Sequence, residues 1–401
     1  MDQFIARQPI LNVHKKLFAY ELLYRGAKHY ALDKVSGNRA TASVLSSVFL
    51  TKDIKDISGF RPCFINFPQK LIEEMLPASF PKSQIVVEIL EDVQPTEKVI
   101  SACQRLHEDG YTIALDDFVY HRQLEPLIEL ADIIKIDIRM TPLDTIMRTL
   151  NLLSRHKVKL LAEKVETLDE FEKANKLGFT YYQGYFFCKP EHIKIKELSA
   201  NKASLLALLA EVTKKTTTIE KLHKIINTDL AITYKLMKFL NSAYFYRLQE
   251  VKTVKHAIAY LGEKELRRFI MLMIVSELAV KKPGELVRLV LVRAKFCELL
   301  GLASPLPCDA SELFMMGLFS LLDTMLNRPM KDIMEHLPVS KNIKDALLLK
   351  TGHYTTFLKI PIAFERNQDA VFTRLLAELG IDPDRAGKCY LVAIRYANGL
   401  M

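Results

Sequence analysis

Residues 111–138 read YTIALDDFVYHRQLEPLIELADIIKIDI and contain one complete strand, helix and strand unit. The β-branched, apolar runs at its two ends predict buried strands, and the amphipathic stretch 121–131 between them predicts a helix. Strands joined through a helix pair in parallel, because a tight turn cannot connect them. This unit therefore predicts a parallel sheet covered by helices.

The same alternation extends in both directions along the chain. Strands are predicted at 63–67, 84–90, 111–118, 133–138, 158–165 and 181–187, and helices at 95–109, 121–131, 141–155 and 167–177. FIARQPIL and LFAYELLY, near the start, predict two further strands. So many units in under 200 residues favour a TIM-like (β/α) barrel, although periodicity also permits a doubly wound sheet.

Beyond Pro190 the strand pattern stops and the sequence becomes helical. Thr217 and Glu220 fit a capping box at a helix start, and Gly262 fits a left-handed helix end. We therefore expect two domains, an α/β barrel over 1–194 and an all-α domain over 195–401.

Composition and charge limit the classes of protein. The chain has 49% hydrophobic and 26% charged residues, which is a globular composition. No apolar run reaches the ~20 residues of a membrane span, and the start lacks a secretory pattern, so we expect a cytoplasmic protein. The net charge of +9 favours an anionic partner such as a nucleotide. Because the basic residues are spread along the chain, nucleic-acid binding is not predicted.

Polar residues stand where the predicted barrel strands end, and five of them are carboxylates. They are Glu21, Asn66, Glu88, Asp116, Asp117, Lys135, Glu163 and Gln183. In a parallel barrel these strand ends share one rim, which is where such folds carry chemistry. Converging carboxylates repel unless cations neutralise them, and an oxygen-only set suits Mg²⁺ or Mn²⁺. The set predicts hydrolysis of a phosphodiester by water.

The ordered series YELLYR, FINF, VEILE, DDF, KID, AEKVE and QGYFFCKP resembles the EAL family of cyclic di-GMP phosphodiesterases, over roughly residues 3–190. The resemblance implies a metal-dependent opening of cyclic di-GMP to linear pGpG, and a possible homodimer. The implied metal ligands are Glu21, Asn66, Glu88, Asp116, Asp117 and Glu163. Glu163 is also the implied base, Lys135 the group that orients the water, and Glu21 belongs to the catalytic set.

The resemblance extends to residues around this set. Gln8 and Arg25 match positions that contact the dinucleotide, Gln183 lies beside the site, and Glu91 supports the loop after the aspartate pair. Two departures from the family stand out, Val119 in place of the glycine of DDFG and Lys164 in place of the glycine of AEGVE. Both predict weaker metal binding.

Residues 195 to about 395 resemble the HDOD family, a helical relative of the HD phosphohydrolases. The resemblance rests on INTDLAITYKLMKFLNSAYFY (226–246), with Asp229, Asn241 and Ser242, and on TVKHAIAYLGEKELRRF (253–269). Ser320 and Leu321 stand where an HD enzyme carries its His and Asp ligands, so this half is expected to be a non-catalytic regulatory module with an unknown protein partner.

Three functions remain open from the sequence. The first is a cyclic di-GMP phosphodiesterase, which the complete polar set favours. The second is a sensor that binds the dinucleotide without cutting it, which Val119 and Lys164 favour. The third is a protein scaffold, which leaves the carboxylate cluster unexplained.

Overall fold

The computed structural model describes residues 4–25, 57–188, 200–214, 216–222, 254–280 and 282–401. The chain divides into two compact units, Met1–Lys189 and Pro190–Met401, which we call the barrel unit and the helical unit. Asp229, Asn241 and Ser242 lie outside the described residues.

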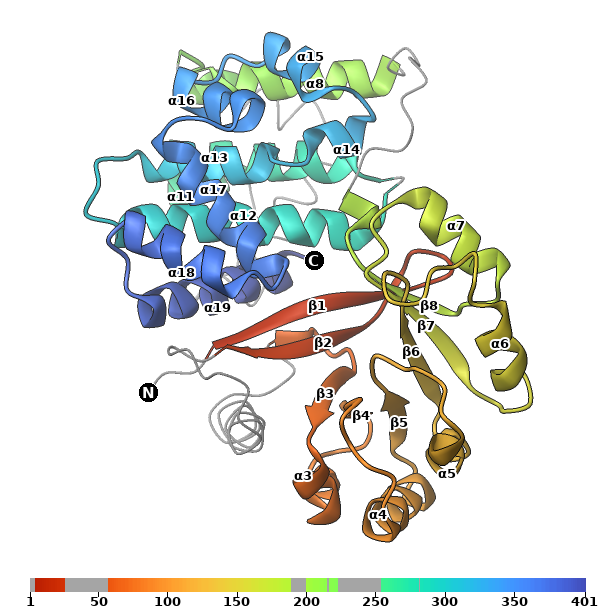
Figure 1. Ribbon diagram of the computed structural model, residues 1–401. Coiled ribbons are helices and arrows are strands. Elements are labelled where there is room, and N and C mark those ends of the chain that lie inside the picture. Colours follow the sequence, from red (N-terminus) through yellow and green to blue (C-terminus); the bar gives the residue numbers. More distant parts are fainter. Residues whose placement is uncertain (1–3, 26–56, 189–199, 215, 223–253, 281) are drawn as a thin grey trace. The chain divides into compact units, whose positions relative to one another are not determined.

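Eight strands close into a barrel in chain order (Figure 1). The first strand pairs antiparallel with its two neighbours, and the pairs from the second strand to the eighth are parallel. The strands are β1 Phe4–Asn12, β2 Leu17–Arg25, β3 Cys63–Phe67, β4 Ile85–Ile89, β5 Thr112–Leu115, β6 Ile133–Asp137, β7 Lys159–Glu163 and β8 Tyr181–Gln183. The predicted barrel is confirmed, and the doubly wound alternative is wrong.

Helices follow the parallel strands on the outside of the barrel (Figure 1). They are α3 Gln69–Glu73, η1 Leu76–Ser79, α4 Glu97–Glu108, η2 Arg122–Leu124, α5 Glu125–Ile128, α6 Met147–Leu153, α7 Leu168–Lys176 and η3 Phe186–Cys188. Thr167 and Glu170 form a capping box that begins α7. The helices α5 and α6 are shorter than the stretches 121–131 and 141–155 predicted for them.

The barrel interior is closed by one apolar layer to which every strand contributes a residue. Its members are Ile10, Ala19, Phe64, Val86, Ala114, Ile133, Leu161 and Tyr181, all buried. Side chains alternate between the two faces of a strand, so the residues two positions away along each strand also point inward. This layer therefore determines which side chains form the next layer toward the barrel mouth.

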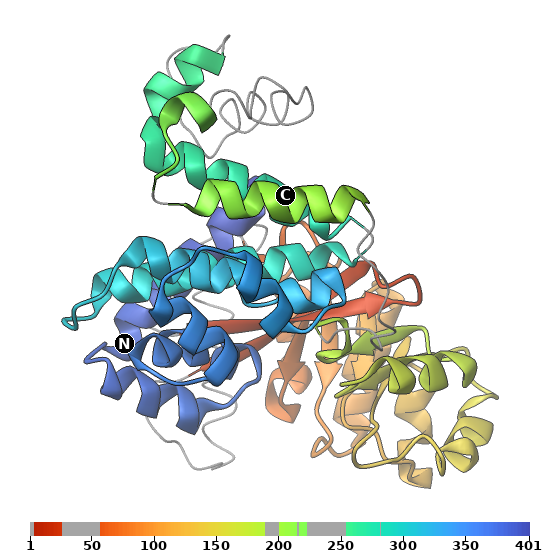
Figure 2. The same cartoon turned by 90° about the horizontal axis from the view of Figure 1, so that it is seen from above.

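The described part of the helical unit consists of helices, as expected, and Figure 2 shows them from a second direction. They are α8 Ala200–Thr213, α11 Val254–Leu278, α12 Gly284–Ala303, α13 Ala310–Phe319, α14 Leu322–Leu326, α15 Met330–His336, α16 Lys341–Lys344, the π-helical turn η4 Asp345–Leu349, α17 His353–Glu365, α18 Asp369–Glu378 and α19 Pro383–Leu400.

The helix α12 is the centre of this unit and packs against α13, α17 and α19. At Gly317 of α13 a Cβ would lie 2.6 Å from Cα of Ala294, so only glycine allows this approach. Arg293 of α12 donates two hydrogen bonds, of 2.8 and 2.6 Å, to the carboxylate of Glu365 in α17. Both side chains are buried, so this ion pair ties the two helices together inside the unit.

Two local predictions in this unit have different outcomes. Gly262 has a φ of 70° and a ψ of 168°, so it interrupts the helical conformation within α11 where the sequence predicted a break, but this is not the left-handed helical conformation of the predicted cap. The capping box at Thr217 is wrong, because the next helical turn begins at Ile219 and the Thr218 side chain accepts the N–H of Lys221 at 3.4 Å. Among the described helices, none is long and apolar enough to cross a membrane.

Candidate functional site

A polar layer lies directly above the apolar layer of the barrel. Each of its members is two residues from an apolar-layer residue on the same strand or just past its end, so all point to the interior. The members are Gln8, Glu21, Asn66, Glu88, Asp116, Lys135, Glu163 and Gln183. The eight positions therefore follow from strand alternation and from the register that closes the barrel.

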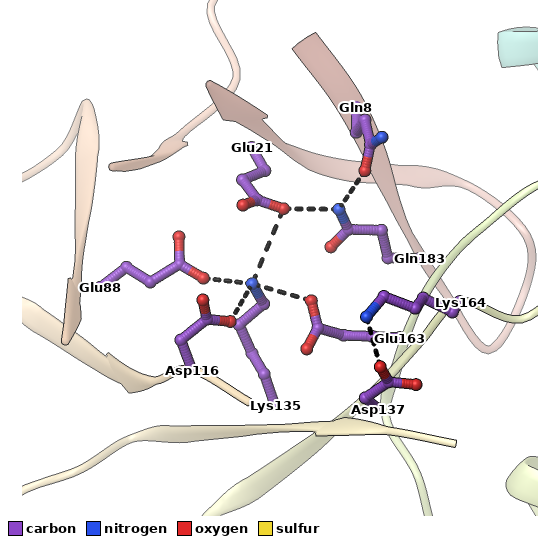
Figure 3. A network of polar contacts seen from close by, with 9 residues as sticks. All are labelled: Gln8, Glu21, Glu88, Asp116, Lys135, Asp137, Glu163, Lys164 and Gln183. Atoms are coloured by element: carbon purple, nitrogen blue, oxygen red, sulfur yellow. Dashed lines mark hydrogen bonds and ion pairs between the residues drawn. The ribbon is translucent and has the colours of Figure 1, made fainter. Parts of the chain in front are cut away.

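Lys135 of β6 is the centre of the layer (Figure 3). Its ammonium contacts four carboxylates, from Glu21 at 3.6 Å, Asp116 at 2.7 Å, Glu163 at 3.0 Å and, in a short ion pair, Glu88. The lysine side chain is fully buried. We call these five residues the inner cluster, and one ammonium there faces four carboxyl groups.

Gln183 connects the inner cluster to the antiparallel strand β1. Its side-chain amide donates to Oε2 of Glu21 at 2.6 Å and to Oε1 of Gln8 at 2.8 Å (Figure 3). Gln8 stands opposite Glu21 in the ladder between β1 and β2. The three predicted site residues are thus together, and Gln183 fixes the orientation of the Glu21 carboxylate.

Burial determines the protonation of the inner cluster. Desolvation raises the pKa of Glu88 well above its usual range and that of Glu163 to about 8. Desolvation alone would lower the pKa of Lys135, but the surrounding carboxylates, Glu21 first, raise it well above its usual range. In the absence of a cation the lysine therefore stays charged, and Glu163 holds a proton at neutral pH.

Several buried oxygens of the polar layer have no hydrogen-bond partner. They are Oδ1 of Asn66, Oε2 of Glu88, Oε2 of Glu163 and Oε1 of Gln183. An unpartnered buried acceptor is costly, so such atoms indicate a ligand position. Carboxylate and amide oxygens are hard donors, which fit Mg²⁺, Mn²⁺ or Ca²⁺. The donor set present here therefore fits a divalent cation.

The side chain of Asp117 points to the site because of its backbone conformation and not because of strand alternation. Strand β5 ends at Leu115, and a residue directly after Asp116 would point outward by alternation. Asp117 has a φ of 39°, which turns its side chain, and one oxygen each of Glu91, Asp116 and Asp117 lie within 4.8 Å of one another. Glu91 is therefore close to the aspartate pair, where the sequence placed it.

One site residue, Asp137 at the end of β6, was not predicted. It lies two positions beyond Lys135, so the alternation that placed Lys135 inward also points to it. Its buried carboxylate forms a short ion pair with Lys164 (Figure 3). The family departure at position 164 is thus part of the site and not a distant surface change.

Two further predicted residues, Arg25 and Val119, are not part of the polar layer. The backbone of Arg25 ends β2 opposite Phe4, and its side chain lies outside the described part of the structure. Val119, the other departure, is 54% exposed. It lines a pocket of about 400 Å³ together with Asp116, Asp117 and Lys164.

A closed β/α barrel with a buried carboxylate cluster at its mouth defines a class of proteins whose site suits a divalent cation. The EAL domain family matches residues 54–190, and the HDOD domain family matches residues 199–332. The chain is 35% identical over 99% of its length to cyclic di-GMP phosphodiesterase CdgJ of Vibrio cholerae, covering 93% of that protein. It is also 35% identical to the uncharacterized protein YuxH of Bacillus subtilis, covering all of this chain and 99% of that one.

Among solved structures, an EAL domain protein from Listeria monocytogenes aligns at 21% identity with a TM-score of 0.39, over 46% of this chain and 87% of that chain. The full-length relatives settle the family. The chain belongs to the family of proteins that combine an EAL domain with an HDOD domain.

Proposed function

We propose that this protein hydrolyses cyclic di-GMP to linear pGpG with the help of divalent cations. The observation that carries the proposal is the inner cluster, in which four carboxyl groups share one ammonium and leave buried oxygens without partners. The relative from Vibrio cholerae, which matches nearly the whole chain, bears the name of this activity. The buried acid cluster would only cost stability in a protein that binds nothing there.

Charge balance supports a cation at this site. Fully ionised, the inner cluster carries four negative charges against the single positive charge of Lys135. Glu21, Asn66, Glu88, Asp116, Asp117 and Glu163 are the proposed ligands, and Mg²⁺ or Mn²⁺ the proposed ions, because all donors are oxygen. When bound, these ions supply positive charge that attracts the phosphodiester and makes water a better nucleophile at neutral pH.

The side chains of the chain itself perform the remaining steps. Glu163 accepts the proton of the attacking water, and Lys135 holds that water and the developing negative charge. A new bond forms from the water oxygen to phosphorus, and the bond from phosphorus to the ribose 3′ oxygen breaks. That oxygen takes a proton from solvent water as it leaves, and Glu163 returns its proton to solvent. Gln183 fixes Glu21 through its 2.6 Å hydrogen bond. Gln8 and Arg25 are proposed to bind the dinucleotide.

A second candidate function is a sensor that binds cyclic di-GMP without turnover. Two observations favour it, the exposed Val119 in the loop after the aspartate pair and the ammonium of Lys164 in the site. Both would weaken metal binding and leave the dinucleotide contacts intact. The two candidates therefore differ in turnover and agree in binding.

The test is incubation of the purified full chain with cyclic di-GMP and Mn²⁺, with pGpG followed by chromatography. We expect turnover that stops with EDTA and that falls at least about a hundredfold in Glu163→Gln, which removes the proposed base. Lys157→Met, an exposed lysine before β7, is the matched control and should keep wild-type turnover. Binding of cyclic di-GMP in Ca²⁺ without turnover in Mn²⁺ would instead support the sensor. Absence of both binding and turnover would support the protein scaffold.

We also propose that the helical unit is a non-catalytic module that contacts a protein partner, that the chain can form a homodimer, and that it acts in the cytoplasm. Ser320 follows α13 and receives a hydrogen bond from Arg293, so this position is engaged in the interior of the unit. To test the helical unit alone, the barrel site is inactivated by Glu21→Gln. This full-length variant should then show no phosphatase or phosphodiesterase activity on model esters with added metals. Sedimentation at rising protein concentration tests the homodimer.

A further inference from the structure

Lys164 has a backbone conformation that turns it toward the site. It directly follows Glu163, the last residue of β7, so simple alternation would point it away from the barrel interior. Its φ is 56°, in the left-handed region that a residue with a Cβ rarely adopts. Lysine has no intrinsic preference for this conformation. The conformation directs the Lys164 side chain over the end of β6, where it meets Asp137.

The ammonium of Lys164 lies beside two carboxylates at the outer edge of the inner cluster. It pairs with Oδ2 of Asp137, whose Oδ1 accepts the N–H of Arg139 at 2.7 Å. Asp117, itself turned by a φ of 39°, lines the same pocket as Asp137 and Lys164. Strands β5, β6 and β7 are neighbours, so these three residues lie side by side at the barrel mouth.

This arrangement places a fixed positive charge where a second cation would have to bind. Lys135 already stands among the inner carboxylates. The oxygens at their outer edge are those of Glu91, Asp116 and Asp117, which lie within 4.8 Å of one another and line the same pocket as Lys164. A divalent ion held by these outer oxygens would face the Lys164 ammonium within the same pocket. The Lys164 side chain is 58% exposed, so water screens its charge. Even in the dielectric of bulk water, an ammonium about 6 Å from a divalent ion weakens binding of that ion by about tenfold.

We propose that Lys164 takes the place of a second divalent cation, so that this protein holds one ion tightly at the inner cluster while a tethered ammonium neutralises Asp117 and Asp137. Lys164 is thus a positioning residue that sets the metal stoichiometry of the site. The inference rests on the proposed function, because it assumes that the inner cluster binds a divalent cation.

The test counts Mn²⁺ ions bound to the full chain. Protein freed of metal is titrated with MnCl₂, and free Mn²⁺ is measured by electron paramagnetic resonance without substrate. We expect one tight site in the wild type and in Lys164→Arg, which keeps the charge. Lys164→Met should gain a second site with affinity increased at least about tenfold. Lys164→Gly removes the charge and also relieves the backbone strain. If Lys164→Gly and Lys164→Met gain the same second Mn²⁺ site, the gain comes from loss of the charge and not from relief of the strain.

Two controls locate the effect. Lys157→Met removes an exposed lysine near the opposite end of β7 and should leave one tight site. Glu88→Gln should abolish that tight site, since Glu88 belongs to the inner cluster. Two equally tight sites in the wild type, unchanged by Lys164→Met, would overturn the inference and leave the proposed function standing. Folded protein that binds no Mn²⁺ in any variant would overturn both.

Discussion

Replacement of Lys135 by methionine removes the ammonium at the centre of the inner cluster and preserves most of the side-chain volume. The lysine is fully buried and contacts four carboxyl groups, three of them at 3.0 Å or less. Loss of one partner from a buried ion pair costs about 3–5 kcal/mol. For a domain of this size each kcal/mol shifts the melting temperature by about 2–4 °C. We expect Lys135→Met to lower the melting temperature of the barrel unit by roughly 6 to 20 °C in EDTA.

The assay is thermal unfolding of the full chain in EDTA and in Mn²⁺, with Lys157→Met as the control. In Mn²⁺ the gap between Lys135→Met and wild type should narrow, because a cation can replace the missing charge. In a Glu88→Gln background, Lys135→Met should lower the melting temperature by less than it does in the wild type, since one fewer carboxyl group is left without a counter-ion. A melting temperature in EDTA within about 2 °C of wild type would refute the account of Lys135 as the counter-ion of this cluster.

Three further predictions concern pH and packing. Burial raises the pKa of Glu163 to about 8, and the carboxyl must lose its proton before it can bind a cation. The apparent Mn²⁺ affinity, measured by titration, should therefore rise between pH 6.5 and 8.5, by up to about tenfold per pH unit. Gly184→Ala should destabilise the barrel by roughly 2–5 kcal/mol in thermal unfolding, because a Cβ would lie 2.0 Å from a backbone oxygen, whereas Gly178→Ala meets nothing within 4 Å and should cost less. Arg293→Met should destabilise the helical unit by about 3–5 kcal/mol in thermal unfolding, and Glu365→Leu added to it should recover much of the loss.

An Mn²⁺ affinity that is flat or falls with rising pH would mean that no proton leaves the site on metal binding. Equal losses in Gly184→Ala and Gly178→Ala would show that strain alone, and not the clash, sets the cost. A double variant at Arg293 and Glu365 less stable than Arg293→Met would show that the pair is not the source of the loss.

Strand periodicity explains why most of the site could be predicted. The residues Glu88 and Lys135 stand two positions after Val86 and Ile133 in strands of near-continuous apolar character, so their inward direction follows from alternation alone. The barrel closure then brings these side chains together without further information. The same rule points Asp137, two positions beyond Lys135, toward the barrel mouth.

The rest depends on contacts that no local pattern encodes. Asp117 and Lys164 point into the site because of left-handed backbone conformations, which are uncommon for residues other than glycine and asparagine. The role of Lys135 as a shared counter-ion depends on the ends of four other strands meeting around β6. The pairing of Arg293 with Glu365 joins residues 72 positions apart, and burial of the pair becomes visible only in the packed helices.

The most direct test of the central claim is an anomalous difference map at the manganese absorption edge, from crystals of the full chain grown with MnCl₂. We predict a peak inside the barrel mouth, about 2.0 to 2.6 Å from oxygens of Glu21, Asn66 and Glu88. An active protein with no peak there, or with its only peak away from the inner cluster, would contradict the account.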